Sequence, residues 1–266
     1  MGYNLTAKGA QAGYHMEVAR GNVTGQTMIH KFGRADITTG WVDIWTPGTV
    51  YPFPTTASTL EAISSDVNDT SAGSGARTIT VEGLDASWDI QTETITMNGT
   101  SASTATSGSF IRVYRAWVAT SGTYGTLSAG GNAGTITIRV ASAGATLAEI
   151  ALLPNGATPG SGQTEMAIYT IPNAKTGYLH SGYFNVDGNK SAQLALWKRD
   201  NADDTSAPVD SRRLLFTIDG LSSTSQLQPI LPIGPLNAKT DVWMSARGSA
   251  AGTSVDVDFE IHLIDN

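Results

Sequence analysis

The sequence predicts an all-β protein made of two β-sandwich or jelly-roll-like domains that follow an N-terminal arm. Charged residues make up only 15% of the 266 residues, so the residues that favour long helices are scarce. Short segments rich in Thr, Val and Ile recur along the chain, and the 29 Gly and 10 Pro punctuate them. Short β-rich segments separated by turn residues are typical of sandwiches and barrels.

Residues 1–29 have no clear hydrophobic period and too little apolar surface to fold alone. We therefore predict an N-terminal arm that a neighbouring subunit orders, by strand addition or by wrapping. The first sandwich is predicted to span residues 30–153. Its expected strands are residues 78–84, 90–97, 110–118, 135–140 and 149–153.

Residues 154–163 contain two Pro and three Gly, which predicts a linker between the domains. The second sandwich is predicted to span residues 164–266. Its expected strands are residues 166–171, 178–186, 193–198, 214–218, 241–247 and 255–263. The last of them alternates perfectly between apolar and polar side chains, which indicates a sheet with one face on a core and the other in water.

Residues 45–54 hold three prolines and three aromatic side chains, so they predict an irregular loop rather than a ladder strand. Proline stiffening lowers the entropy lost when a loop docks, which suits a contact surface. We predict a subunit interface at Trp41, Trp45, Tyr51 and Phe53. The alternative is that the loop packs against its own domain.

Composition and motifs exclude several function classes. The net charge of −7 argues against nucleic acid or a membrane as partner. With no Cys, no HxH or HExxH pair among the four His and no phosphate-binding loop, we expect no metal site, no cofactor and no enzymatic activity. His180 is expected to pack or lie at the surface, and His262 to be solvated.

Three groups of acidic residues could still carry chemistry. Asp85, Asp89 and Glu93 are candidates for the two carboxylates of a glycan-degrading enzyme. Residues 66–69 and 200–204 are candidates for calcium loops, although neither has the twelve-residue EF-hand pattern. Turn formation by short acidic side chains is the competing interpretation of each loop.

Several segments resemble a family of tailed-phage virion structural proteins, known mostly from aquatic phages. The segments are residues 35–39, 42–45, 51–55, 69–78, 81–85, 98–100, 112–115, 132–139, 166–172, 175–178 and 259–266. Together they extend over most of residues 30–266, whereas residues 1–29 have no counterpart. The resemblance implies a non-enzymatic virion component and supplies no catalytic residues.

From these observations we predict a capsid cement or decoration protein that stabilises the phage head. The alternative is a tail, baseplate, neck or receptor-binding component of the virion. The expected partners are the major capsid protein or other virion proteins and further copies of the chain, most simply as a trimer. The expected location is the virion, assembled in the host cytoplasm.

Overall fold

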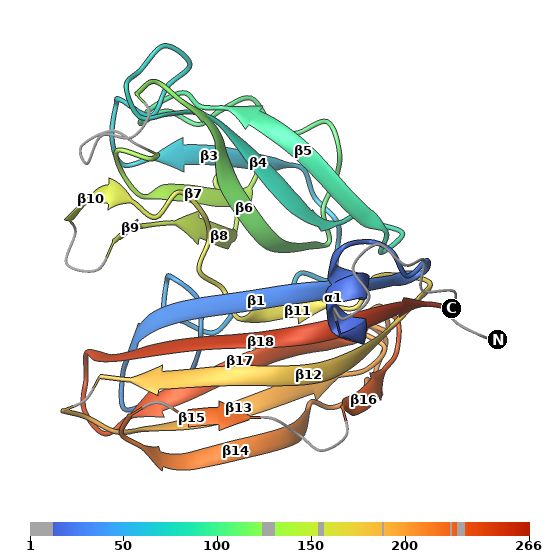
Figure 1. Cartoon of the computed structure of the whole chain (residues 1–266). Coiled ribbons are helices and arrows are strands. Elements are labelled where there is room, and N and C mark those ends of the chain that lie inside the picture. The colour runs from blue at the N-terminus through green and yellow to red at the C-terminus, as the bar shows by residue number, and fades with distance from the viewer. Residues whose placement is uncertain (1–12, 124–130, 154–156, 188, 224, 228–231) are drawn as a thin grey trace.

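A computed structural model describes residues 13–123, 131–153, 157–187, 189–223, 225–227 and 232–266. Figure 1 shows two groups of strands, one above the other, joined into one body. The predicted all-β class is confirmed. In chain order the elements are α1 (Tyr14–Ala19), β1 (Gln26–Ile37), β2 (Val42–Asp43), β3 (Leu60–Ser64), β4 (Ala76–Leu84), β5 (Ile90–Thr96), β6 (Arg112–Ser121), β7 (Ile136–Val140), β8 (Thr146–Ile150), β9 (Leu152–Leu153), β10 (Ala157–Gly160), β11 (Ile168–Thr170), β12 (Lys175–Val186), β13 (Ala192–Arg199), β14 (Arg213–Leu221), β15 (Ser225–Leu227), β16 (Ile233–Leu236), β17 (Asp241–Gly248) and β18 (Thr253–Asp265).

The C-terminal sandwich consists of two sheets. Sheet A has the order β1-β18-β12, with β15 and β16 both paired to the far edge of β12. Sheet B has the order β11-β17-β13-β14, and β2 pairs with β17. Their facing sides bury one hydrophobic cluster that includes Leu194, Leu196, Val257 and Phe259.

The second sandwich, here called the central sandwich, is formed by strands from β3 to β8. It is smaller and lies above the C-terminal sandwich in Figure 1. One sheet has the order β3-β7-β8 and the other β5-β4-β6. A second hydrophobic cluster fills it, with Ile79, Val81, Ile136 and Leu147 among its fully buried members.

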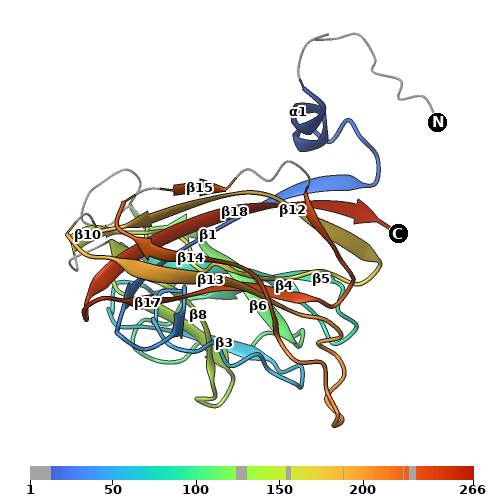
Figure 2. The same ribbon diagram turned by 90° about the horizontal axis from the view of Figure 1, so that it is seen from below.

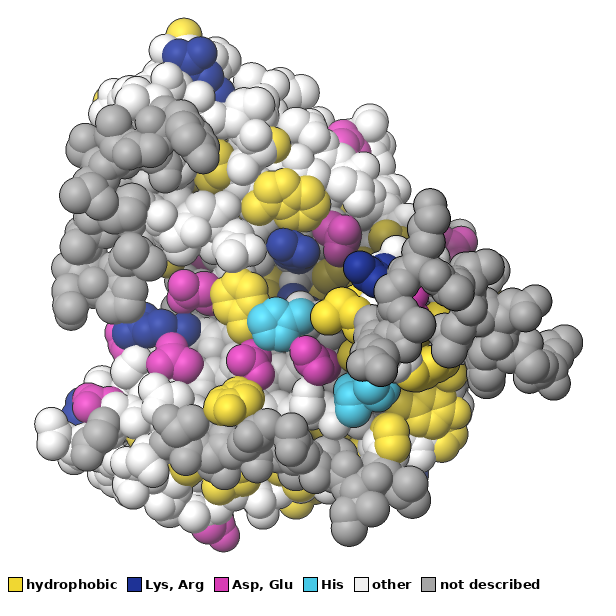
Figure 3. Space-filling model, in the orientation of Figure 1, with side chains coloured by type: hydrophobic (Ala, Val, Ile, Leu, Met, Phe, Trp, Pro, Cys, Tyr) yellow, Lys and Arg dark blue, Asp and Glu magenta, His cyan; other side chains and the backbone are white. Residues whose placement is uncertain are grey.

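The alternation predicted for the last strand, β18, decides which face of sheet A packs on the core and which face points outward. Val255, Phe259 and Leu263 on β18 are buried, whereas Asp256 and His262 point outward and are half-buried. Figure 3 shows this outer face of sheet A, where acidic side chains and histidines gather. In Figure 2, α1 stands off the body on the same side of sheet A.

Strand pairing corrects the predicted domain boundaries at the N-terminal side. β1 pairs with β18 along its whole length, from Gln26 with Ile264 to Ile37 with Thr253. Residues 30–37 therefore belong to the C-terminal sandwich and not to the first predicted domain. Residues 26–29, predicted to lie in an arm held by a neighbour, are paired within their own chain, while residues 1–12 of that arm lie outside the described residues.

The predicted linker at residues 154–163 is also corrected. β10 pairs with β9, and Gly162 and Thr164 form backbone hydrogen bonds with Val118 and Ala116 of β6. This segment is therefore tied to the edge of the central sandwich because its backbone groups complete the ladder beside β6. Residues 154–156 lie outside the described residues.

The chain passes between the sandwiches near Ile44 and again near Ala167, and these two connecting segments run side by side. The Ala167 amide donates to the Ile44 carbonyl at 2.8 Å, and Trp45 and Met166 form an antiparallel bridge. Gly33 of β1 lies directly beneath them: an added Cβ would stand 2.4 Å from the Ala167 nitrogen and 2.8 Å from the Ile44 oxygen. A residue without a side chain is therefore required where the connecting segments press on sheet A.

Candidate functional site

The proline-rich loop, residues 45–54, fills the junction between the two sandwiches. Its aromatic rings form a chain of contacts: Trp45 to Tyr51 at 5.1 Å, Tyr51 to Phe53 at 4.9 Å, and Phe53 to Trp243 of β17 at 4.9 Å between centroids. The Tyr51 hydroxyl donates to the Val113 carbonyl of β6 at 3.1 Å. The loop thereby connects the central sandwich with sheet B.

This position changes the interpretation of the predicted interface residues. Trp45 and Tyr51 are 2% and 1% exposed within their own chain, so their side chains present no surface to another subunit. The alternative interpretation, packing against the loop's own domain, describes these two residues. Phe53 is half-buried, and Trp41 is 43% exposed.

A buried ion pair links the sandwiches next to the loop. Arg112 of β6 donates from Nε and from its second terminal nitrogen to the two carboxylate oxygens of Asp241 on β17, both at 2.9 Å. Thr170 Oγ1 donates to the same carboxylate at 2.6 Å. The guanidinium also lies 4.9 Å from the Trp88 ring centroid and 5.5 Å from that of Phe53. The guanidinium and the carboxylate each have several partners, and the bidentate bond between them has a fixed geometry, which favours one relative placement of the two sandwiches.

A pocket of about 390 Å³ opens on the outer face of sheet B, beside the loop. Its floor follows from strand register: Ser245 of β17 lies opposite Asp43 of β2 on one side and opposite Ala195 of β13 on the other, and Ala195 lies opposite Thr217 of β14. Because the side chains in this row are short, they leave a hollow above the sheet. The adjacent row is bulky, because Trp243 faces Trp197 across the same strands.

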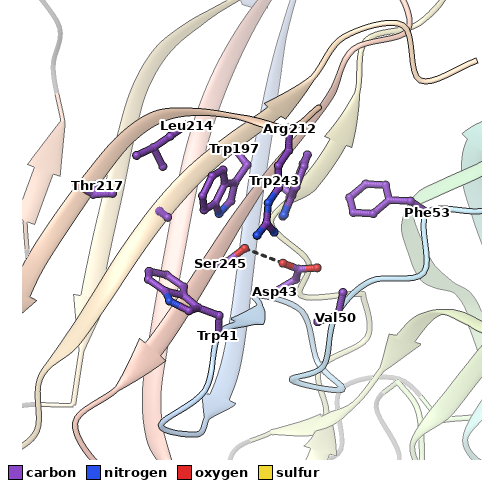
Figure 4. Close-up of a pocket in the computed structure, with 11 residues that line it drawn as sticks. Trp41, Asp43, Val50, Phe53, Trp197, Arg212, Leu214, Thr217, Trp243 and Ser245 are labelled. Atoms are coloured by element: carbon purple, nitrogen blue, oxygen red, sulfur yellow. Dashed lines mark hydrogen bonds between the residues drawn. The ribbon is translucent and has the colours of Figure 1, made fainter. Parts of the chain in front are cut away.

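Aromatic and charged side chains form the walls (Figure 4). Arg212 stacks on Trp197, with its guanidinium carbon 4.5 Å from the ring centroid, and its side chain extends toward Asp43. The Arg247 guanidinium lies 5.7 Å from the Trp41 ring centroid. Trp41 and Phe53, two of the four predicted interface residues, thus meet in one pocket, together with residues that sequence reasoning did not single out.

Asp43 is the buried acid of this pocket. Its two oxygens accept hydrogen bonds at 2.7 Å from Ser245 Oγ and from the Tyr51 amide. Burial raises the pKa of the Asp43 carboxyl, and the bonds from Ser245 and Tyr51 and the charge of Arg212 oppose that rise. The Trp243 side chain also hydrogen-bonds this carboxyl, so three of the roughly four bonds that a carboxylate can accept are made within the chain.

Three histidines that are far apart in the sequence meet on the outer face of sheet A. The ring of His15 in α1 lies 4.1 Å from that of His180 on β12 and 6.1 Å from that of His262 on β18. His262 Nε2 lies 2.7 Å from the side-chain oxygen of Gln26. Burial and then the neighbouring His15 and His180 lower the pKa of His262. Motif spacing could not reveal this cluster, because it depends on which strands are neighbours.

Two of the three acidic residues considered for catalysis, Asp85 and Glu93, make local hydrogen bonds through their carboxylates. Asp85 Oδ1 accepts from the amides of Ser87 and Asp89, as in an Asx turn. Glu93 accepts from the amides of residues 107 and 108. Each of these carboxylates therefore organises a loop of the central sandwich.

The loops weighed for calcium are likewise organised by hydrogen bonds. Asp69 is fully buried and accepts from Ser64 Oγ and from the amides of Ala76, Ala133 and Gly134. Asp200 pairs with Lys198 and Arg213. Within the described part of the chain, no group of three or more His, Asp or Glu side chains is placed to hold a metal ion.

No helix in the described part of the chain is long and apolar enough to cross a membrane.

Comparisons with known proteins give weak matches to viral structures. The chain is similar to infectious bursal disease virus Gt strain, with 10% identity, a TM-score of 0.25, and coverage of 96% of this chain and 78% of that chain. The VP2 subviral particle of the same virus matches with 9% identity, a TM-score of 0.24 and the same coverage. TM-scores this low carry no functional inference. No family model and no curated protein matches the sequence.

Proposed function

We propose that this chain is a non-enzymatic structural protein of a phage virion, and that it acts as a cement or decoration protein on the capsid. The observation that carries the proposal is the junction between the sandwiches. The buried Arg112–Asp241 pair and the Tyr51 hydrogen bond connect the two sandwiches directly. A protein that bridges neighbouring shell subunits needs its domains connected in this way, because strain applied at one end must reach the other.

Three further observations support a structural role. The sequence resembles a tailed-phage virion family over most of residues 30–266. Of the three carboxylates considered for glycan hydrolysis, Asp85 and Glu93 accept loop amides, and none of the three lines the pocket of sheet B. The outer face of β18 carries three acidic side chains, Asp256, Asp258 and Glu260, which contact Arg34, His30 and Ser181 within the chain and stay partly exposed to a basic partner surface.

Copy number in purified particles tests the proposal. A decoration protein is present in amounts comparable to the major capsid protein, and adding it to shells that lack it raises their resistance to heat. A few copies per particle, located at the tail or neck by electron microscopy, would overturn the decoration role.

The aromatic pocket of sheet B favours a second candidate, a receptor-binding component of the virion. In that case the chain lies at the end of a tail or fibre, and free protein competes with particles for adsorption to host cells. Shell binding without such competition would exclude this candidate.

A further inference from the structure

The pocket on the outer face of sheet B has both an apolar and a polar side. Its apolar side is aromatic: the rings of Trp41, Trp197 and Trp243 and the edge of Phe53. Its polar side is formed by Asp43, Ser245, Thr217 and Arg212. A ligand that fits must therefore have an apolar face and a polar edge.

The charges in the pocket restrict the ligand further. Arg212 stacks on Trp197 and its charge acts on Asp43, whose carboxyl also takes hydrogen bonds from Ser245, the Tyr51 amide and the Trp243 side chain. Because the opposite charges of Arg212 and Asp43 lie in one pocket and offset each other, the pocket has no net charge that would favour a cation or an anion. A neutral ligand with hydroxyl groups satisfies both, because each hydroxyl can donate to the carboxylate and accept from the guanidinium.

We propose that this pocket binds a neutral hexopyranose unit of a glycan. The carbon–hydrogen face of a pyranose ring carries partial positive charge and packs on the negative face of an indole. The hydroxyls of the sugar lie at the edge of its ring, where they can form hydrogen bonds with Asp43, Ser245 and Arg212. A volume of about 390 Å³ lies in the range of small-molecule sites and accommodates one or two sugar rings.

Trp41 is the stacking residue best placed to meet the sugar. Its side chain is 43% exposed at the rim, so it has area to lose on binding. The guanidinium of Arg247 packs on the ring and holds its orientation. Trp197 carries a closer guanidinium, that of Arg212 at 4.5 Å from its ring centroid, and Trp243 is only 5% exposed, so both offer a ligand less ring area than Trp41.

The size of the hollow is set by Ala195. This residue is fully buried at the pocket floor, between Ser245 and Thr217. A longer side chain there would enter the space that the sugar ring needs while leaving Trp41, Asp43 and Arg212 in place.

Saturation-transfer NMR on the full chain tests the proposal with glucose, galactose, mannose and N-acetylglucosamine at up to about 50 mM. We expect transfer to the ring C–H protons of at least one sugar, with a Kd of about 1–10 mM. Trp41→Ala and Ala195→Leu should each weaken binding about tenfold or more. Tyr183→Ala is the matched control: Tyr183 is 47% exposed on sheet A, and this change should leave binding intact.

Three results would overturn the proposal: no transfer to any of the four sugars, equal transfer in wild type and both pocket variants, or preferential binding of tetramethylammonium. Circular dichroism of each variant confirms that it is folded, and the two pocket variants act through different residues. Sugar binding is also separable from the virion role, because shell attachment and copy number are measured independently of it.

Discussion

The Asp241→Asn substitution should strongly destabilise the protein. It keeps the shape of the side chain but removes the charge that faces Arg112, and the two side chains are 1% and 2% exposed. The carboxylate accepts two bonds from Arg112 and one from Thr170, and the amide group would turn a donor toward one of these donors. Breaking a buried ion pair by removing one partner typically costs about 3–5 kcal/mol of the free energy of unfolding. This is a large part of the roughly 5–15 kcal/mol that holds a domain folded.

Urea denaturation followed by tryptophan fluorescence measures this loss. Trp88 is a suitable probe because its ring stacks on the Arg112 guanidinium. With the junction weakened, the two sandwiches should also unfold in separate transitions, whereas the wild type should unfold in one. Asp36→Asn is the control, since the Asp36 side chain is 61% exposed and paired with Arg34 at the surface. We expect that change to lie within about 0.5 kcal/mol of wild type.

The double variant Arg112→Met/Asp241→Leu separates charge from packing. It removes both charges together, so much of the stability lost in Asp241→Asn should return. A cost below about 1 kcal/mol for Asp241→Asn, with a single transition retained, would refute the view that this pair locks the sandwiches together.

Three further predictions concern Tyr51, Lys31 and His262. Tyr51→Ala should lower the free energy of unfolding by about 3–5 kcal/mol without changing the sedimentation coefficient; a changed oligomeric state with unchanged stability would restore the interface hypothesis. Burial lowers the pKa of Lys31 to about 7, so the unfolded chain binds one more proton between that value and 10.5, and stability from this group rises with pH across the window. Lys31→Met should therefore be more stable than wild type at pH 7, with the gap closing by pH 10 in denaturant titrations. The pKa of His262 lies below 6.5 in the folded protein, so proton uptake opposes the contact of α1 with His180 and His262, and that contact is lost as pH falls. Hydrogen exchange at residues 14–19, corrected for intrinsic rates, should increase between pH 7.5 and 5.5, and equal protection at both values would contradict this.

The fold class and most of the strands follow from local patterns in the sequence. β18 is the clearest case: five apolar side chains alternate with four polar ones, and the structure buries the apolar set. Alternation is a local property that the pleat of any strand converts into two faces, so no partner needs to be known. The sequence does not predict β1, because its inward positions include Lys31 and Gly33, which break the apolar alternation.

Only the tertiary structure decided which strands are neighbours, and therefore which side chains meet. β1 pairs with β18 and so becomes an edge strand of the C-terminal sandwich. Residues 30–37 therefore lie in that sandwich, although their position in the sequence predicts that they belong to the first domain. The pocket depends on register across β2, β17 and β13, which sets Asp43, Ser245 and Ala195 in one row. The histidine cluster depends on β12 lying beside β18. Such long-range pairings are chosen by the burial of whole faces, which no local pattern contains.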